Sequence, residues 1–203
     1  MVRCPRCCSL TVIEGIRTDH RQQPSGTTQM VTSFLPKRGC WSARLPWVGV
    51  VDWILLATKA HQTPAAAPWL AARIAVLQNG VEHQERVGPL AAGRVVPVIV
   101  DFPAESVGRG RIRLHGDPHL LVADDPDGRE FARLMTGARI ATDLTPDFLT
   151  VAWRKLCPNV AGGAITALTC RRMPVFKEPP IAELGLALIK EARDIGHALV
   201  LQQ

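Results

Sequence analysis

Residues 50–58, Val-Val-Asp-Trp-Ile-Leu-Leu-Ala-Thr, form a short and almost wholly apolar run. Such a run is typical of a strand that is buried on both faces of a parallel sheet. The next segment, residues 63–72, is rich in alanine and begins with Thr63 and Pro64, which suit a helix N-cap and a first helical position. A second apolar run covers residues 74–77. The order strand, helix, strand predicts an α/β fold.

The rest of the chain divides into a mixed part and a helical part. We expect short helices over residues 82–91 and 125–135, and strands over residues 94–102, 111–114, 120–123 and 139–141, the later ones in antiparallel pairs. From residue 146 the pattern is helical only, with helices over 147–169 and 181–199. This order predicts an incomplete Rossmann-like nucleotide-binding domain over residues 48–145 and a partial all-helical domain over residues 146–203.

Residues 1–47 differ in composition from everything that follows. They carry seven basic and two acidic side chains, whereas the net charge of the whole chain is +6, so the remainder is nearly neutral. Neither a strand period nor a helix period is visible there. We therefore expect an atypical segment that is irregular or disordered, and we expect no nucleic-acid binding by the body of the protein.

The cysteines are concentrated in the same segment. Cys4 and Cys7 have a spacing that can begin a zinc site, which His20 and Cys40 could complete. A single pair at this spacing is weak evidence, so reduced thiols in a cytoplasmic protein are the favoured interpretation. The chain has no apolar run of membrane-spanning length and no secretory signal at its start, so we expect no membrane partner.

Lys155 and Asn159 are the most suggestive polar pair in the chain. They are four residues apart in the expected helix over residues 147–169, so their side chains project from one face, one turn apart. A lysine beside an amide can bind a carboxylate, polarise a ketone and supply a proton. From spacing alone, an amphipathic helix with a solvated lysine and asparagine is the favoured interpretation.

Three blocks, taken together and in order, resemble the ketopantoate reductases (2-dehydropantoate 2-reductases), NADPH-dependent enzymes of pantothenate and coenzyme A biosynthesis. They are residues 57–63 (Ala-Thr-Lys-Ala-His-Gln-Thr), 77–82 (Leu-Gln-Asn-Gly-Val-Glu) and 153–159 (Trp-Arg-Lys-Leu-Cys-Pro-Asn). The resemblance covers about residues 50–200. It implies that a 2-keto acid, 2-dehydropantoate, is reduced to pantoate with NADPH as the cofactor.

The resemblance also implies roles for individual residues. Lys155 matches the family's general acid, which protonates the alkoxide that hydride addition leaves. Asn159 would hydrogen-bond the substrate. Lys59 would approach the nicotinamide side of NADPH, and Gln62 would approach its ribose or phosphates.

Asn79 and Gly80 would reach the cofactor from the end of the next strand, where a glycine lets the backbone come close. Without the resemblance, the same pair is equally well explained as a plain turn.

The chain also departs from the family pattern. It has no GxGxxG turn, since Arg113 stands where the third glycine after Gly108 and Gly110 would fall. It ends at Gln203 without counterparts of the family's later substrate-binding serine and glutamate. Gly163 stands where many members have a further asparagine.

These departures suggest that the C-terminus is truncated and that a shifted reading frame or altered start has replaced the true N-terminus. The coding DNA tests the idea of a replaced N-terminus. If no alternative reading frame upstream encodes a glycine-rich βαβ unit, that idea is wrong. Weak NADPH binding, or none, is expected from these departures. The alternatives left open are an inactive fragment or interaction protein and a reductase for another 2-keto acid; exposed apolar surface would favour a homodimer.

Overall fold

The computed structural model describes residues 15–16, 52–108, 111–114, 116–138 and 140–200. The chain divides into two compact units, which are described separately. The first unit comprises residues 1–78 and 82–144, and the second comprises residues 79–81 and 145–203. Apart from Gly15 and Ile16, the segment 1–47 and its expected disorder lie outside the described residues, and the three-part division expected from the sequence stays a prediction.

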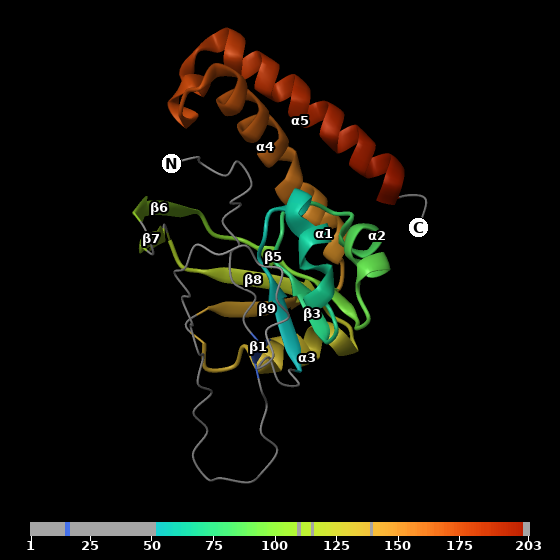
Figure 1. The fold of residues 1–203 in the computed structure, drawn as a ribbon. Coiled ribbons are helices and arrows are strands. Elements are labelled where there is room, and N and C mark those ends of the chain that lie inside the picture. Colours follow the sequence, from blue (N-terminus) through green and yellow to red (C-terminus); the bar gives the residue numbers. More distant parts are fainter. Residues whose placement is uncertain (1–14, 17–51, 109–110, 115, 139, 201–203) are drawn as a thin grey trace. The chain divides into compact units, whose positions relative to one another are not determined.

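A four-stranded sheet is the centre of the first unit (Figure 1). Its order is β1 (Gly15–Ile16), β2 (Trp53–Leu56), β3 (Arg73–Val76) and β4 (Val95–Pro97). β2, β3 and β4 are parallel neighbours, whereas β1 pairs with β2 antiparallel. The expectation that an apolar run over residues 50–58 forms a strand of a parallel sheet is therefore confirmed.

Both faces of this sheet are buried, as the continuous apolar runs require. Ile54 and Leu56 of β2 join Ile74 and Val76 of β3 in one apolar cluster. Trp53 lies in a second cluster with Ala75, Val96 and Phe131. Successive side chains of a strand point to opposite faces, so β2 and β3 each contribute to both clusters.

The connection after β2 differs from the expected single helix over residues 63–72. It consists of η1 (Ala60–Gln62), α1 (Thr63–Ala66) and η2 (Ala67–Trp69). Gln62, not Thr63, precedes α1, and Thr63 is its first residue, so the expected N-cap was wrong. Pro68 lacks the backbone N–H that would continue the α-helix, which explains the early end of α1. After β3 come α2 (His83–Val87) and η3 (Gly88–Leu90), within the expected range 82–91.

The remaining strands form two smaller sheets. β5 (Ile99–Val100), β8 (His119–Ala123) and β9 (Ala141–Thr145) make a three-stranded sheet, and β6 (Ala104–Gly108) pairs with β7 (Arg111–Leu114). The expected strand over residues 94–102 is thus divided between two sheets, because β4 and β5 pair with different partners. The strand expected over residues 139–141 begins only at Ala141, and β6 was not predicted.

α3 (Pro126–Leu134) follows β8 as expected. Asp125 caps it, because its Oδ1 atom accepts a hydrogen bond from the Gly128 N–H at 2.7 Å. Phe131 of α3 lies 5.6 Å from the ring of Trp53, centroid to centroid, and this contact anchors the helix on the sheet.

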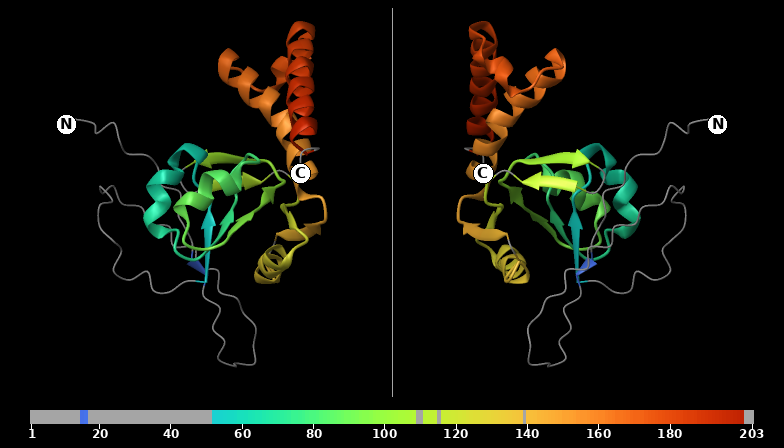
Figure 2. Two further views of the ribbon diagram at one scale, coloured as in Figure 1. Left: turned by 90° about the vertical axis from the view of Figure 1, so that its right-hand side faces the viewer. Right: turned by 90° about the vertical axis from the view of Figure 1, so that its left-hand side faces the viewer.

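The second unit is built on two long helices, α4 (Phe148–Thr169) and α5 (Pro179–Val200), with η4 (Met173–Lys177) between them. Figure 2 shows the two helices from two further sides. Asp147 caps α4 by accepting from the Thr150 N–H at 3.3 Å. Pro158 lies inside α4 and removes one backbone donor, as expected. Within the described residues, no helix is both long and apolar enough to cross a bilayer.

Candidate active site

The second unit brings together two of the residues that the sequence singled out. Lys155 of α4 donates a hydrogen bond from Nζ to Oδ1 of Asn79, 3.2 Å away. Asn79 belongs to the short segment 79–81, which packs with the second unit. A lysine ammonium can only donate, so the carboxamide oxygen must face Lys155 and the NH₂ group of Asn79 must face away from it. An ammonium group is thereby oriented next to an amide donor.

Gly80 continues from Asn79 into a turn that only glycine adopts easily. Its φ angle is 122°, in the left-handed half of backbone space. The absence of a Cβ also leaves the backbone at this point open to close approach by a ligand. The structure thus gives a physical reason for Gly80, which the sequence alone explained as a plain turn or as a cofactor contact.

Asn159 lies one helical turn beyond Lys155 in α4 and is exposed. The helical geometry that places the two side chains on one face is therefore present. Pro158 precedes Asn159 and takes a backbone donor out of the helix at this point, which leaves the carbonyl of Arg154 without its usual intrahelical partner.

Lys59 and Gln62 form a second pair, in the first unit. The Gln62 carboxamide oxygen accepts from the Lys59 backbone N–H at 3.1 Å, and the Gln62 N–H donates to the Lys59 carbonyl at 2.8 Å. These two bonds close the loop directly after β2. The Lys59 side chain is exposed, and Gln62 is half-buried. The Nε2 group of Gln62 is consequently the end of the amide that can donate to a ligand.

The sheet register explains why polar residues gather here. Leu56 of β2 pairs with Val76 of β3 in a parallel ladder, so both strands end at one edge. Lys59 follows the first strand and Gln78 follows the second. The carboxyl ends of parallel strands are where open α/β sheets bind their ligands.

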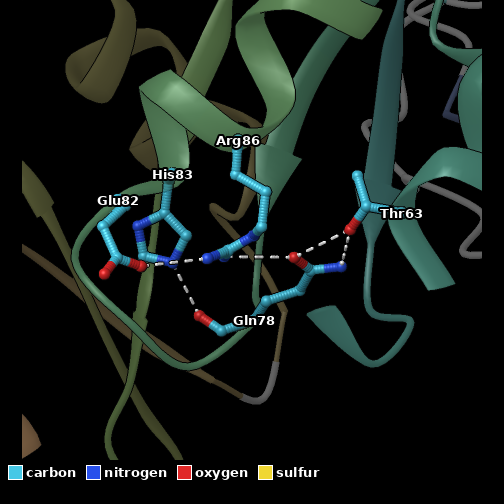
Figure 3. Close-up of polar contacts among 5 residues, drawn as sticks. All are labelled: Thr63, Gln78, Glu82, His83 and Arg86. Carbon is cyan, nitrogen blue, oxygen red and sulfur yellow. Dashed lines mark hydrogen bonds and ion pairs between the residues drawn. The ribbon is translucent and has the colours of Figure 1, made fainter. Parts of the chain in front are cut away.

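The sequence reasoning missed a buried polar cluster, which comprises Thr58, Thr63, Gln78 and His83 with Arg86 at its edge. Figure 3 shows all of these residues except Thr58. The Gln78 Nε2 group donates to the hydroxyl oxygens of Thr58 and Thr63, each at 3.0 Å. The Gln78 Oε1 atom accepts from Arg86 Nη2 at 3.3 Å. In the sequence, Thr58 and Gln78 each follow an apolar run, but a polar residue at such a place is common and does not by itself predict a buried cluster.

His83 completes this cluster through the backbone. Its Nε2 atom lies 2.8 Å from the carbonyl oxygen of Gln78. A carbonyl can only accept, so Nε2 carries the proton and the ring is in the Nε2–H tautomer. Burial lowers the pKa of His83 below its ordinary value, more strongly than the bond to Gln78 raises it. The imidazole is therefore a neutral donor at pH 7.

No cluster of three or more potential metal ligands occurs among the residues that the structure describes. The zinc hypothesis for Cys4, Cys7, His20 and Cys40 concerns residues outside that part of the chain. Cys157 and Cys170 are free thiols, the first buried and the second exposed.

Sequence comparisons point to one family. The model of the family described as ketopantoate reductase PanE/ApbA matches residues 12–126. This match begins inside the segment 1–47. A 2-dehydropantoate 2-reductase from Mycobacterium tuberculosis (strain ATCC 25618 / H37Rv) is 40% identical over 157 residues, which are 74% of this chain and 53% of that protein. One from Caulobacter vibrioides (strain ATCC 19089 / CIP 103742 / CB 15) is 37% identical over 155 residues, which are 73% of this chain and 53% of that protein.

Solved structures agree. A PanE/ApbA family ketopantoate reductase from Ralstonia eutropha JMP134 matches with a TM-score of 0.64 at 25% identity, covering 73% of this chain and 52% of that one. A dimeric ketopantoate reductase from Staphylococcus aureus matches with a TM-score of 0.62 at 25% identity, covering 73% and 57%. A D-mandelate dehydrogenase solved with NADH, at 18% identity and a TM-score of 0.62, shares the fold, with coverage of 73% and 54%. The chain spans about half the length of the curated relatives it matches.

Proposed function

Because the chain belongs to the ketopantoate reductase family PanE/ApbA, we propose that its site serves the reduction of 2-dehydropantoate to pantoate with NADPH. The observation that carries this proposal is the hydrogen bond from Lys155 Nζ to Asn79 Oδ1. It supports the proposal because an oriented ammonium group is what a ketone reduction needs besides its hydride source.

NADPH, when bound, would supply a hydride to the keto carbon. Lys155 would stabilise the negative charge that develops on the substrate's carbonyl oxygen and would donate a proton to it from Nζ. Asn79 holds the ammonium group through its carboxamide oxygen, so the lysine is oriented before the substrate arrives. Asn159, one turn along α4, is proposed to hydrogen-bond the substrate.

The cofactor-binding proposal rests on residues at the strand ends. Gly80 has the positive φ and the missing Cβ that suit a backbone lying against a flat ring. Lys59 offers an exposed ammonium group after β2, and Gln62 offers its Nε2 donor to ribose or phosphate oxygens. Each of these groups is proposed separately as a contact to the cofactor. The choice of NADPH over NADH, the place of reaction in the cytoplasm and assembly into a homodimer are parts of the same proposal, the last supported by the dimeric relative.

Calorimetric titration with NADPH and NADH, together with turnover of 2-dehydropantoate, tests the proposal. We expect NADPH to bind more tightly than NADH. Lys155→Ala is expected to lower kcat by roughly 10²- to 10⁴-fold, the range that general acids contribute. Lys190→Ala, which removes an exposed lysine from α5, is the matched control and should keep kcat.

The result also separates the reductase from a non-catalytic member of the family. Native-like protein that binds neither cofactor and turns over neither 2-dehydropantoate nor other 2-keto acids contradicts the proposal. Turnover of another 2-keto acid with the same dependence on Lys155 would keep the mechanism and change only the substrate.

A further inference from the structure

We propose that Gln78 is a positioning residue, whose buried amide holds the Asn79–Gly80 turn in place and so fixes the acceptor that Asn79 offers to Lys155. This inference rests on the proposed function for its catalytic consequence. Its structural part stands on the hydrogen bonds of Gln78 alone.

The orientation of the Gln78 amide follows from its neighbours. Arg86 has only donors, so the group 3.3 Å from its Nη2 atom must be the carboxamide oxygen of Gln78. The NH₂ group then points toward Thr58 and Thr63, whose hydroxyl oxygens accept its two hydrogens at 3.0 Å. Both ends of the amide are satisfied in this orientation. In the flipped one the NH₂ group would face the Arg86 donor, so Arg86 decides the orientation, whereas the hydroxyls of Thr58 and Thr63 can bond either end.

The main chain of Gln78 is held as well. His83 Nε2–H donates to its carbonyl oxygen at 2.8 Å, and that carbonyl belongs to the peptide group shared with Asn79. The side chain and the carbonyl of Gln78 are thus fixed by separate partners. The direction in which the chain leaves β3 toward Asn79 is set before Gly80 turns it at a φ of 122°.

The burial of these groups argues for a role in positioning. Gln78 is 6% exposed and Thr63 is fully buried. Their polar atoms lose contact with water on folding, a cost that apolar side chains at the same positions would not have. A buried amide that is satisfied at every position contributes direction more than stability, because hydrogen bonds are angular and apolar contacts are not. The residue that this arrangement orients is Asn79, which is exposed and accepts a hydrogen bond from Lys155.

The test uses the full chain with four variants. Gln78→Met keeps the length of the side chain and removes the amide. Thr63→Val keeps the shape and removes one hydroxyl, whereas Thr63→Ser keeps the hydroxyl. Thr142→Val is the matched control, because the Thr142 hydroxyl is buried without a hydrogen-bond partner.

The first readout is hydrogen exchange of the backbone amides of residues 79–81. We expect at least about tenfold faster exchange in Gln78→Met and Thr63→Val, and wild-type exchange in Thr63→Ser and Thr142→Val. The amides of β2 and β3 should keep their protection. Unchanged exchange at residues 79–81 would overturn the inference, and so would equal loss of protection throughout the first unit, because the cluster would then only stabilise the fold. Should Gln78→Met fail to fold, Thr63→Val decides alone.

The second readout is turnover. Gln78→Met is expected to lower kcat by about 10- to 100-fold, since misplacement of a catalytic group by about 1 Å costs up to 10², while KM for NADPH stays within about threefold. In a Lys155→Ala background the same substitution should change kcat by less than about twofold, because the group it positions is gone. An additive loss in that background would overturn the catalytic part. Absence of turnover in the wild type would refute the proposed function, and the exchange experiment would still decide on Gln78.

Discussion

Lys155 and Asn79 are 76 positions apart in the chain, yet the Nζ atom of the first donates to the Oδ1 atom of the second at 3.2 Å. One residue comes from a helix of 22 residues and the other from a turn after a buried strand. Both lie in blocks on which the resemblance to the ketopantoate reductases rests. Each block alone is a common sequence pattern. The hydrogen bond shows that residues of two of these blocks contact each other in the folded chain.

The acceptor of this bond should matter more to the rate than to substrate binding. Asn79→Ala removes one hydrogen bond to a charged group, a contact worth about 1.5–3 kcal/mol, or roughly 10- to 100-fold. We expect this loss in kcat. Asn159→Ala should instead raise KM for the 2-keto acid with a smaller change in kcat, because Asn159 is proposed to hold the substrate. Steady-state kinetics of the two asparagine variants compare the roles directly, and a KM effect of Asn79→Ala alone would contradict the assignment.

The backbone of Gly80 provides a second prediction. Gly80→Ala places a Cβ on a residue with a φ of 122°, a conformation that costs other residues of order 1–3 kcal/mol. We expect lower stability in urea titrations and weaker NADPH binding. Gly163→Ala is the control, because Gly163 is exposed inside α4 and a Cβ there meets no atom within 4 Å. Since alanine favours helix over glycine by about 1 kcal/mol, Gly163→Ala should stabilise the protein.

The local sequence pattern was sufficient to predict strands that are buried on both faces. It was insufficient where contacts with distant parts of the chain determine which strands pair. The apolar runs that became β2 and β3 could be recognised because strands buried on both faces carry few polar residues. The run over residues 94–102 has the same character, yet it serves two sheets, because partner choice is decided by strands distant in sequence.

The candidate site shows the same division. The spacing of Lys155 and Asn159 was readable, because a helix fixes which residues share a face. The buried cluster around Gln78 was not, because a glutamine after a strand is ordinarily solvated and its partners Thr58 and Thr63 lie 20 and 15 positions away. Thr63 looked like an N-cap by type, but its hydroxyl is directed to Gln78 instead.

The packing of the helices in the second unit yields a third prediction. A Cβ built on Gly196 of α5 would lie 2.8 Å from Cδ2 of Trp153, closer than real Cβ contacts. Trp153 is a rigid ring that is half-buried, so it cannot yield cheaply. Gly196→Ala should therefore destabilise the second unit by about 1–3 kcal/mol, the usual cost of overpacking. The tryptophan fluorescence of Trp153 should change in the same variant. A variant as stable as Gly163→Ala would contradict this packing.

The pKa of His83 makes stability depend on pH. Burial lowers this pKa in the folded protein below 6.5, whereas the unfolded chain keeps a value near 6.5. Above pH 6.5 the imidazole of His83 is neutral in both states, and its protonation does not reduce the free energy of unfolding. As the pH falls below 6.5, the unfolded state binds the proton first, so the free energy of unfolding decreases until the pH passes the folded pKa.

We expect urea midpoints to fall as the pH is lowered from about 7 to about 5. His83→Gln should flatten that decline, and its carboxamide can still donate to the Gln78 carbonyl. His61→Gln, which removes an exposed histidine, should leave the decline as in the wild type. A decline that persists unchanged in His83→Gln would show that other groups cause it.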